Sequence, residues 1–253
     1  MPSEERKEPG LLTPPTAEVL ATAELEIIGR LAHASNGTFL ARCRVERDDQ
    51  RPGESLAVYK PAAGERPLGD FATDTLYRRE VASYELSKWL GWGLVPATVA
   101  RGDGPLGAGS LQAFVDHDPE EHYFSLLDDH RRFFRRLAFF DMLANNADRK
   151  GGHCLLDASG RVWAIDHGLT FHTEPKLRTV LWDFAGERLP AAERRGAARL
   201  ASALAETSDI ARALSGLLSR NEVDSLRERA QSLSPAGVYP TPESSWAFPW
   251  PLV

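Results

Sequence analysis

Residues 146–168 read NADRKGGHCLLDASGRVWAIDHG, and this stretch decides the predicted fold. Two short apolar runs, 154–156 and 162–165, lie on either side of a Gly-containing turn, which predicts a small hairpin. Asp148 lies on the loop before the hairpin, and Asp166 follows its second strand. Two acids placed in this way can face one cleft, where one orients or deprotonates a hydroxyl and the other holds a metal on phosphates. Taken singly, each acid is better explained as a turn or capping residue.

The segments around this stretch separate into a strand-rich first part and a helix-rich second part. Residues 128–144 are apolar nearly all round after Arg132, which is typical of a buried helix. Residues 191–233 are rich in Ala, Leu, Arg and Glu and suit two helices. In the first part, short apolar runs bounded by Gly, Pro or Asn predict strands. These runs cover residues 25–31, 38–45, 55–61, 95–100 and 111–115.

One helix is expected among the strands, and the two ends of the chain are expected to lack regular structure. The helix fits residues 74–90, with Asp74 as its N-cap and Gly91 as its stop. Residues 1–16 are polar and Pro-rich, which predicts a disordered tail. The five prolines and two tryptophans of residues 234–253 predict an extended strap or a mobile segment.

The order of these elements predicts an α+β fold of two lobes without internal repeats. A length of 253 residues suits one large domain or two small lobes. The expected parts are a disordered tail over 1–16, a small strand-rich N-lobe over 17–115, a helical C-lobe over 116–233 and a Pro/Trp-rich C-terminal extension over 234–253.

The composition excludes several classes of protein. Lys and Arg number 30 against 36 Asp and Glu, so the formal net charge is −6, and no block of five like charges occurs. This balance argues against a general nucleic-acid binder and against an enzyme held on membranes by charge. Two cysteines, Cys43 and Cys154, exclude a disulfide framework and a four-cysteine zinc site. With no run of about 18 apolar residues and no signal-peptide pattern at the start, we expect a soluble, cytoplasmic protein.

A predicted ion pair between Lys60 and Glu80 adds to the two acids. On the helix of residues 74–90, Glu80 shares one face with Tyr77 and Tyr84 by three- and four-residue spacing. A carboxylate on an apolar face needs a partner, because an unpaired buried charge is strongly unfavourable, and Lys60 is the only lysine of the preceding strand. A strand Lys paired with a helix Glu holds nucleotide phosphates in kinases, whereas Lys60 taken alone fits a strand end in water.

Together these residues give the chain a resemblance to a known family. It resembles the lipid-kinase-like branch of the protein kinase superfamily, with phosphatidylinositol 3-/4-kinases and the bacterial persistence-toxin Ser/Thr kinases. More closely, it resembles an actinobacterial phosphatidylinositol-kinase-like group, over roughly residues 25–190. The matching segments are VYKP (58–61), REVA (79–82), NADRKGGH (146–153), AIDHG (164–168) and KLRTVLW (176–182).

The resemblance implies a bilobal protein-kinase-like fold that binds ATP with Mg²⁺ or Mn²⁺ between its lobes. By the same resemblance, Lys60 grips a phosphate and Glu80 orients Lys60. Asp148 is then the catalytic-loop acid, and Asp166 is a metal ligand. The loop around Gly37 is expected to cover the phosphates, and the hinge of residues 112–115 to bind the adenine. The implied nucleotide-binding residues are Ser35, Asn36, Gly37, Lys60, Gln112, Phe114 and Val115.

His153 departs from the pattern of that family. The family's catalytic loop carries a metal-binding Asn five residues after the catalytic Asp, and His153 takes this place. As a direct metal ligand, an imidazole suits Mn²⁺ better than Mg²⁺. The alternative is that His153 donates a hydrogen bond to Asp148 or to a phosphate oxygen, so that Asp166 alone holds one Mg²⁺. The phosphate-covering loop also has a single glycine, Gly37, where many kinases have several.

The expected activity is ATP-dependent transfer of the γ-phosphate to a hydroxyl of a protein or small molecule. The sequence shows no basic patch and no membrane-inserting segment, so neither a phosphoinositide acceptor nor stable membrane association is expected. Nucleic acid is not expected as a partner either. Two alternatives use the same cleft: a nucleotide-binding pseudokinase that acts as a regulatory module, and a protein adenylyltransferase.

Overall fold

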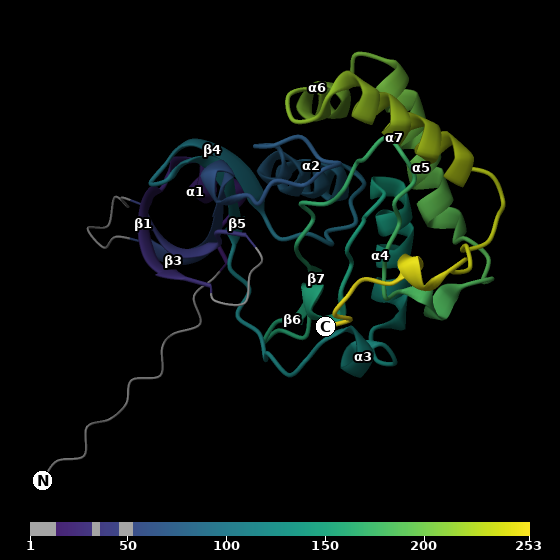
Figure 1. The fold of residues 1–253 in the computed structure, drawn as a ribbon, viewed down its shortest axis with the longest axis horizontal. Coiled ribbons are helices and arrows are strands. Elements are labelled where there is room, and N and C mark those ends of the chain that lie inside the picture. Colours follow the sequence, from purple (N-terminus) through teal and green to yellow (C-terminus); the bar gives the residue numbers. More distant parts are fainter. Residues whose placement is uncertain (1–13, 32–35, 46–52) are drawn as a thin grey trace, which may run out of the picture.

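Five antiparallel strands form the first lobe of the protein. The computed structural model describes residues 14–31, 36–45 and 53–253, so most of the predicted tail of residues 1–16 lies outside the described part. The sheet has the order β1-β2-β3-β5-β4, and all neighbouring strands are antiparallel (Figure 1). The strands are β1 (Glu24–Arg30), β2 (Phe39–Val45), β3 (Gly53–Pro61), β4 (Thr98–Gly104) and β5 (Gly107–Ala113). Each of the five predicted strands is therefore present.

The β4–β5 hairpin is tighter than the sequence predicts, because the glycines between the predicted runs 95–100 and 111–115 belong to the strands. The turn itself is Pro105-Leu106. Gly104 and Gly109 lie against the ring of Tyr59, and a Cβ on either glycine would overlap this ring. The Tyr59 hydroxyl donates a hydrogen bond to the Gly107 carbonyl at 2.5 Å. Residues without a side chain are therefore required inside these strands rather than between them.

A short helix that the sequence analysis missed precedes the sheet. This helix, α1 (Ala17–Thr22), begins after Thr16, whose side chain accepts a hydrogen bond from the Val19 N–H at 3.3 Å. Its Leu20 is fully buried in the apolar cluster of the first lobe. Thr16 is a local signal for a helix start, but a segment of six residues is too short to show a helical period.

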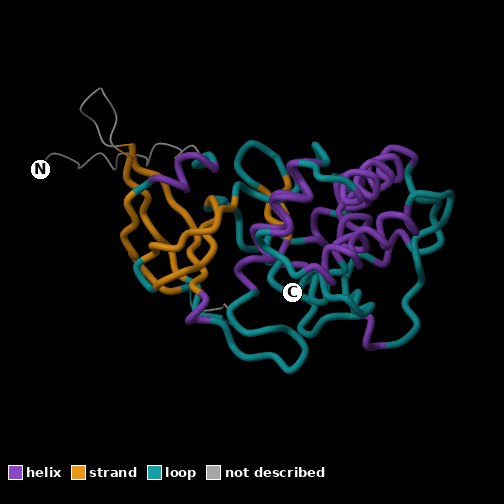
Figure 2. The backbone as a smooth tube through the Cα atoms, turned by 90° about the horizontal axis from the view of Figure 1, so that it is seen from above, coloured by secondary structure: helices purple, strands orange, loops and turns teal. Residues whose placement is uncertain are grey.

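Helices dominate the second lobe, and Figure 2 shows the strands at one end of the molecule and most helices at the other. The lobe contains the hairpin of β6 (Cys154–Leu156) and β7 (Val162–Ala164), with α3 (Tyr123–Leu126), α4 (Arg131–Ala144), α5 (Ala191–Ala205), α6 (Asp209–Ser215) and α7 (Arg220–Leu233). Residues 191–233 form three helices rather than the predicted two, because Ser208 and Ser219 each cap a new helix start. The predicted helix of residues 128–144 begins only at Arg131.

The start of α2 (Leu76–Trp89) corrects the predicted N-cap. Asp74 has a left-handed φ of 59°, and Thr75 takes the N-cap position without a side-chain capping bond. The Glu65 carboxylate, from the loop before the helix, instead accepts the Tyr77 N–H at 2.9 Å. A residue eleven positions before the helix thus satisfies a donor that the local sequence leaves open.

The end of α2 follows the prediction. Gly91 has a φ of 70°, and its N–H donates to the Lys88 carbonyl at 3.0 Å. The Trp92 N–H donates to the Ser87 carbonyl, also at 3.0 Å. These two bonds form a Schellman motif, which requires a residue that tolerates a left-handed backbone.

Each lobe has its own large apolar cluster. The larger one lies in the second lobe around Phe134, Phe139 and Phe140, and it includes Leu86 of α2. The smaller one packs α1 against the sheet. Because α2 shares the larger cluster, it is attached to the second lobe although its sequence lies among the strands. Within the described residues, none of the helices is long and apolar enough to cross a membrane.

Residues 234–253 run as an extended strap over the second lobe and return toward β6 and β7 (Figure 1). The Ala247 carbonyl accepts the Thr179 N–H at 3.0 Å. Near the end of the strap, the Leu252 carbonyl accepts the Gly151 N–H at 2.7 Å. The structure therefore shows the extended strap, one of the two predicted alternatives, and it ends on the loop that follows α4.

Candidate active site

Lys60 on β3 joins the two lobes through two carboxylates. Its Nζ contacts Oε1 of Glu80 on α2 and lies 2.9 Å from Oδ1 of Asp166, which follows β7. The second oxygen of Glu80 accepts the backbone N–H of His167 at 2.8 Å. Glu80 is only 2% exposed, so its carboxylate depends on these protein donors rather than on water. The structure brings Lys60 and Glu80 together and adds Asp166 to the pair.

The charges of this cluster stabilise one another. Burial alone would lower the pKa of Lys60, but Asp166 and Glu80 outweigh burial and raise this pKa above its ordinary value. The Lys60 ammonium in turn holds the pKa of Asp166 well below its usual range. Both groups are therefore charged at neutral pH. An ammonium and a carboxylate that face one space are the groups that hold nucleotide phosphates and their cation in kinases.

Lys60→Ala and Glu80→Ala are each expected to weaken nucleotide binding, because Glu80 acts by holding Lys60 in place. The double variant is expected to lose little more than either single variant, with a coupling energy between about 0.5 and 3 kcal/mol. Calorimetric nucleotide Kd values for the four proteins measure this coupling. Lys88→Ala, at an exposed lysine of the same helix, is the control. Additive losses at the two sites would contradict the pairing.

Asp148 lies on the loop that begins at the end of α4. The helix ends at Ala144, and the left-handed φ of 53° at the C-cap residue Asn145 turns the chain into the loop. The Asp148 N–H donates to Oδ1 of Asn146 at 3.0 Å, and Nζ of Lys150 lies 3.4 Å from Oδ2 of Asp148. Burial raises the pKa of Asp148 above its ordinary value, against the opposing effect of Lys150. A carboxylate with a raised pKa can accept a proton from an acceptor hydroxyl.

A fully buried ion pair between Arg149 and Asp141 supports both loops of the site. Nε and Nη2 of Arg149 lie 2.8 and 3.0 Å from the two Asp141 oxygens, and neither side chain is exposed. Nη1 of Arg149 donates to the Ile165 carbonyl at 2.7 Å. Arg149 therefore fixes the loop of Asp148 against the turn that carries Asp166.

This ion pair is not predicted from the sequence, although Asp141 carries a signal. Asp141 interrupts the buried face of α4, just as Glu80 interrupts that of α2, and an acid in such a place needs a partner. Two further side chains complete the network. Nδ2 of Asn146 donates to Asp141 at 3.0 Å, and Nε2 of His167 lies 2.7 Å from Nη2 of Arg149. Burial keeps the pKa of His167 well below its ordinary value, so its neutral ring accepts from Arg149.

The predicted phosphate-covering loop is anchored on the connection between β3 and α2. Ser35 lies outside the described residues. Oδ1 of Asn36 accepts the Arg66 N–H at 3.0 Å, and the Gly37 N–H donates to the Gly64 carbonyl at 2.8 Å. A Cβ on Gly37 would lie 3.0 Å from the Gly64 Cα, so a glycine is needed for this close approach.

The predicted hinge connects β5 with the second lobe. The Gln112 side chain is buried and donates to the Thr98 hydroxyl at 2.8 Å, so it supports the sheet instead of facing a ligand. The Phe114 N–H donates to the Leu56 carbonyl at 3.1 Å, and Val115 is buried. The structure therefore does not favour Gln112 as a side-chain contact of an adenine, while Phe114 and Val115 stay predictions.

Two sequence comparisons identify relatives of this chain. Residues 101–211 match the family described as Phosphatidylinositol 3- and 4-kinase, and this segment contains Asp148 and Asp166. Protein Rv2133c of Mycobacterium tuberculosis (strain ATCC 25618 / H37Rv) is 40% identical over 270 residues, which cover 92% of this chain and 94% of the relative. The chain belongs to the phosphatidylinositol 3-/4-kinase-like family. Lys60 and Glu80 lie outside the matched segment, so their place in this kinase-like site depends on the geometry described above.

Two solved structures are similar to this kinase-like fold. The crystal structure of a Helicobacter pylori proinflammatory kinase, CtkA, is 11% identical with a TM-score of 0.49, and the match covers 85% of this chain and 92% of that chain. The structure of hydra Fam20 with sugar is 13% identical with a TM-score of 0.47, and the match covers 86% of each chain. The predicted α+β fold with a strand-rich lobe and a helical lobe is confirmed.

His153 takes the place of the metal-binding Asn that the resemblance to the kinase-like family implies. The Lys150 N–H donates to Nδ1 of His153 at 3.3 Å, which leaves the ring proton on Nε2. Nε2 lies 3.3 Å from Oδ2 of Asp166. Burial lowers the pKa of His153 to about 4, so the ring is neutral at pH 7. A protonated Nε2 cannot bind a cation, so this geometry favours His153 as a hydrogen-bond donor to Asp166. The predicted acceptor of this bond was Asp148 or a phosphate oxygen.

The site of this kinase-like protein fits a divalent cation whose ligands are mostly phosphate oxygens and water molecules. The Asp166 side chain is 48% exposed, so one carboxylate is open to a cation. Within the described residues, no group of three or more His, Cys, Asp or Glu side chains gathers as a metal site. Mg²⁺ needs only one or two carboxylates beside substrate phosphates and waters. Asp166 would hold the cation, and the cation would offset the charge of the phosphates.

His153→Ala is expected to leave the ratio of Mn²⁺- to Mg²⁺-supported nucleotide binding unchanged, because no metal ligand is removed. Nucleotide-induced thermal stabilisation with each metal measures this ratio in the wild type and the variant. The matched control is Asp166→Asn, which should lose binding with both metals. A marked fall of the Mn²⁺ preference in His153→Ala would show that the imidazole is a direct ligand after all.

Proposed function

We propose that this protein transfers the γ-phosphate of ATP to a hydroxyl of a protein or small molecule. The family supports a kinase-like phosphotransferase in general, and the proposal adds ATP and the class of acceptor. One observation carries it: the Lys60 ammonium lies between Glu80 and Asp166. The two alternatives, a nucleotide-binding pseudokinase and a protein adenylyltransferase, are outcomes of the experiment below.

Each charged group of the site has one task in this reaction. Lys60, held by Glu80, binds a phosphate oxygen, and Asp166 holds the divalent cation. Asp148 accepts the proton of the acceptor hydroxyl while the acceptor oxygen bonds to the γ-phosphorus. The bond from the γ-phosphorus to its bridging oxygen breaks, and ADP leaves. Positioning and preorganised charge supply most of the rate acceleration in phosphoryl transfer, which explains why loops fixed by a buried ion pair carry the acids.

A soluble acceptor in the cytoplasm suits the charge of this protein. The net charge of −6 and the lack of a block of basic residues do not favour attraction to anionic lipids or to nucleic acid. The proposed acceptor is therefore not a phosphoinositide, despite the name of the family.

Incubation with ATP labelled at the γ- or the α-phosphate tests the proposal. Purified protein receives Mg²⁺ or Mn²⁺ with each label, and label is followed in inorganic phosphate, in the protein itself and in added hydroxyl compounds. We expect transfer of the γ-label, with water as the slowest acceptor. Transfer of the α-label would show an adenylyltransferase instead. Saturable nucleotide binding without release of either label, even to water, would show a pseudokinase.

A further inference from the structure

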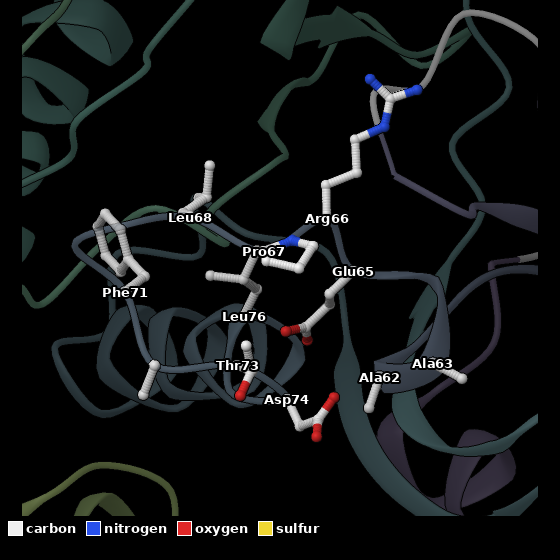
Figure 3. Close-up of a pocket in the computed structure, with 11 residues that line it drawn as sticks. Ala62, Ala63, Glu65, Arg66, Pro67, Leu68, Phe71, Thr73, Asp74 and Leu76 are labelled. Atoms are coloured by element: carbon white, nitrogen blue, oxygen red, sulfur yellow. The ribbon is translucent and has the colours of Figure 1, made fainter.

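Exposed apolar side chains gather along the end of the C-terminal strap. The hollow around Glu65, which Figure 3 shows, is different, because its lining mixes charged, polar and apolar side chains. More than half of the large apolar side chains that are exposed among the described residues belong to the strap or lie beside it. They are Phe124 of α3 and Trp246, Phe248, Trp250, Leu252 and Val253, which together form the strap surface. Exposed apolar surfaces of this kind mark sites of interaction.

The strap is attached through its backbone, which leaves its two tryptophan rings free. Nε and Nη2 of Arg178 donate to the Trp246 and Phe248 carbonyls, each at 3.0 Å. Nε1 of Trp182 donates to the Ala247 carbonyl at 3.2 Å. The side chains of Trp246 and Trp250 are 79% and 83% exposed, so they contribute little to this attachment. Exposed aromatic rings that the fold does not need are available to a partner.

The strap surface begins beside the loop of Asp148, and Figure 1 shows the end of the strap next to α3 and β6. A Cβ on Gly151 would lie 3.1 Å from Cε2 of Phe124 and 3.3 Å from the Leu252 carbonyl oxygen, so both residues meet at Gly151. Gly151 follows Asp148 closely in the sequence, and their Cα atoms are at most about 11 Å apart. About four residues of an extended polypeptide span this distance. A protein segment that presents a hydroxyl to Asp148 is therefore long enough to reach the strap surface.

Acidic residues precede the part of this surface that α3 contributes. Residues 116–121 read DHDPEE and contain four acids and no Lys or Arg. Asp116, Asp118 and Glu120 are exposed. Within the described part of the chain, none of the four acids forms an ion pair. Unpaired acids beside apolar side chains complement a partner with basic and apolar side chains, and they repel anionic lipids and nucleic acid.

We propose that the strap surface is a docking surface for a protein acceptor, which contacts it with apolar and basic side chains near the hydroxyl that receives the phosphate. This inference rests on the proposed function, because it narrows the acceptor to a protein segment of stated composition. Three observations support it: the exposed aromatic side chains, their closeness to the loop of Asp148, and the unpaired acids. The same acids disfavour a membrane as the occupant, and membrane binding is therefore an outcome of the test.

Fluorescence anisotropy with a short fluorescein-labelled peptide tests the surface without nucleotide. In this peptide, Arg and Leu alternate on both sides of one Ser. We expect saturable binding of this peptide, and binding weaker by about tenfold or more for peptides with Glu in place of Arg or Gly in place of Leu. Trp246→Ser removes an exposed ring but keeps the backbone carbonyl that Arg178 binds, and it should weaken binding by about tenfold.

Leu106→Ser is the matched control, because it removes an exposed apolar side chain from the β4–β5 turn of the first lobe. This variant should bind the peptide as the wild type does. The double variant Asp116→Asn/Glu120→Gln tests the acids and should weaken binding. Glu206→Gln/Glu228→Gln removes the same charge after α5 and on α7, and it should not weaken binding. All four acids are exposed, so both double variants are expected to fold.

Several results would overturn the docking surface. One is the absence of saturable binding to the folded wild type, and another is equal binding by Trp246→Ser and the wild type. Equal weakening in Leu106→Ser and Trp246→Ser, or in the two double variants, would overturn it as well, because the place of the change would not matter. Sedimentation with neutral phosphatidylcholine vesicles tests the membrane. Binding of vesicles but not of the peptide, lost in Trp246→Ser, would show a membrane-binding surface instead.

The γ-label experiment separates this inference from the proposed function. Transfer of the γ-label to the Ser of the bound peptide would support both. Peptide binding by a protein that transfers the γ-label to no acceptor, water included, would overturn the proposed function, while the docking surface would stand. Transfer of the γ-label to water or another hydroxyl by a protein that does not bind the peptide would overturn the docking surface alone.

Discussion

Asp148→Asn is expected to reduce phosphoryl transfer by roughly 10²- to 10⁴-fold, the usual contribution of a general base, while nucleotide binding stays near that of the wild type. An amide cannot accept the proton of an acceptor hydroxyl, but it preserves the shape of the side chain. The backbone bond from the Asp148 N–H to Asn146 is also kept. Rates of γ-label transfer and nucleotide-induced thermal stabilisation measure the two effects separately.

Asp166→Asn gives the contrasting result, because it removes the charge that holds the cation. We expect it to lose metal-dependent nucleotide binding and transfer together. Asp129→Asn, at an exposed aspartate of the second lobe, should change neither. Transfer by Asp148→Asn at the wild-type rate would show that Asp148 does not have the role proposed here.

Arg149→Met is expected to lower the free energy of unfolding by about 3 to 5 kcal/mol, because it leaves the Asp141 carboxylate buried without its partner. The same range applies to Asp141→Leu, which leaves the guanidinium unpaired. The double variant removes both charges and should recover much of this loss. Urea unfolding of the four proteins measures the effect.

The surface pair of Arg212 and Asp209 provides a matched control. Both side chains are more than half exposed, and Arg212→Met should change stability by less than about 1 kcal/mol. Additive losses for the two buried substitutions would contradict the description of Arg149 and Asp141 as one unit. Because Arg149 also contacts Ile165 and His167, recovery in the double variant is expected to be incomplete.

Most of the fold could be predicted because its elements have local signals. The five strands show as short apolar runs between turn residues, and Gly91 ends α2 where a left-handed residue is required. The errors occur where a residue distant in the sequence determines the local structure. Glu65 accepts the donor that Asp74 was expected to satisfy, and Tyr59 requires glycines within the strands of the β4–β5 hairpin.

The candidate site also contains some residues that the sequence predicts and others that it does not. Lys60, Glu80, Asp148 and Asp166 could be predicted because their charges stand out against apolar neighbours or follow a recognisable pattern. Asp141 offered the same signal as Glu80, but its partner Arg149 comes from a loop, where sequence spacing does not predict a contact. The side chain of Gln112 could not be placed from the sequence, since its bond to Thr98 depends on the register of β4 and β5.

The hydrogen bond from Gly151 to the Leu252 carbonyl has a practical consequence for handling the protein. Val253 lies next to this bond, and its Cγ1 would be 3.6 Å from a Cβ on Gly152. Any residues added after Val253, such as an affinity tag, would therefore begin beside the loop that carries Asp148. Kinetic work is better done without residues added after Val253.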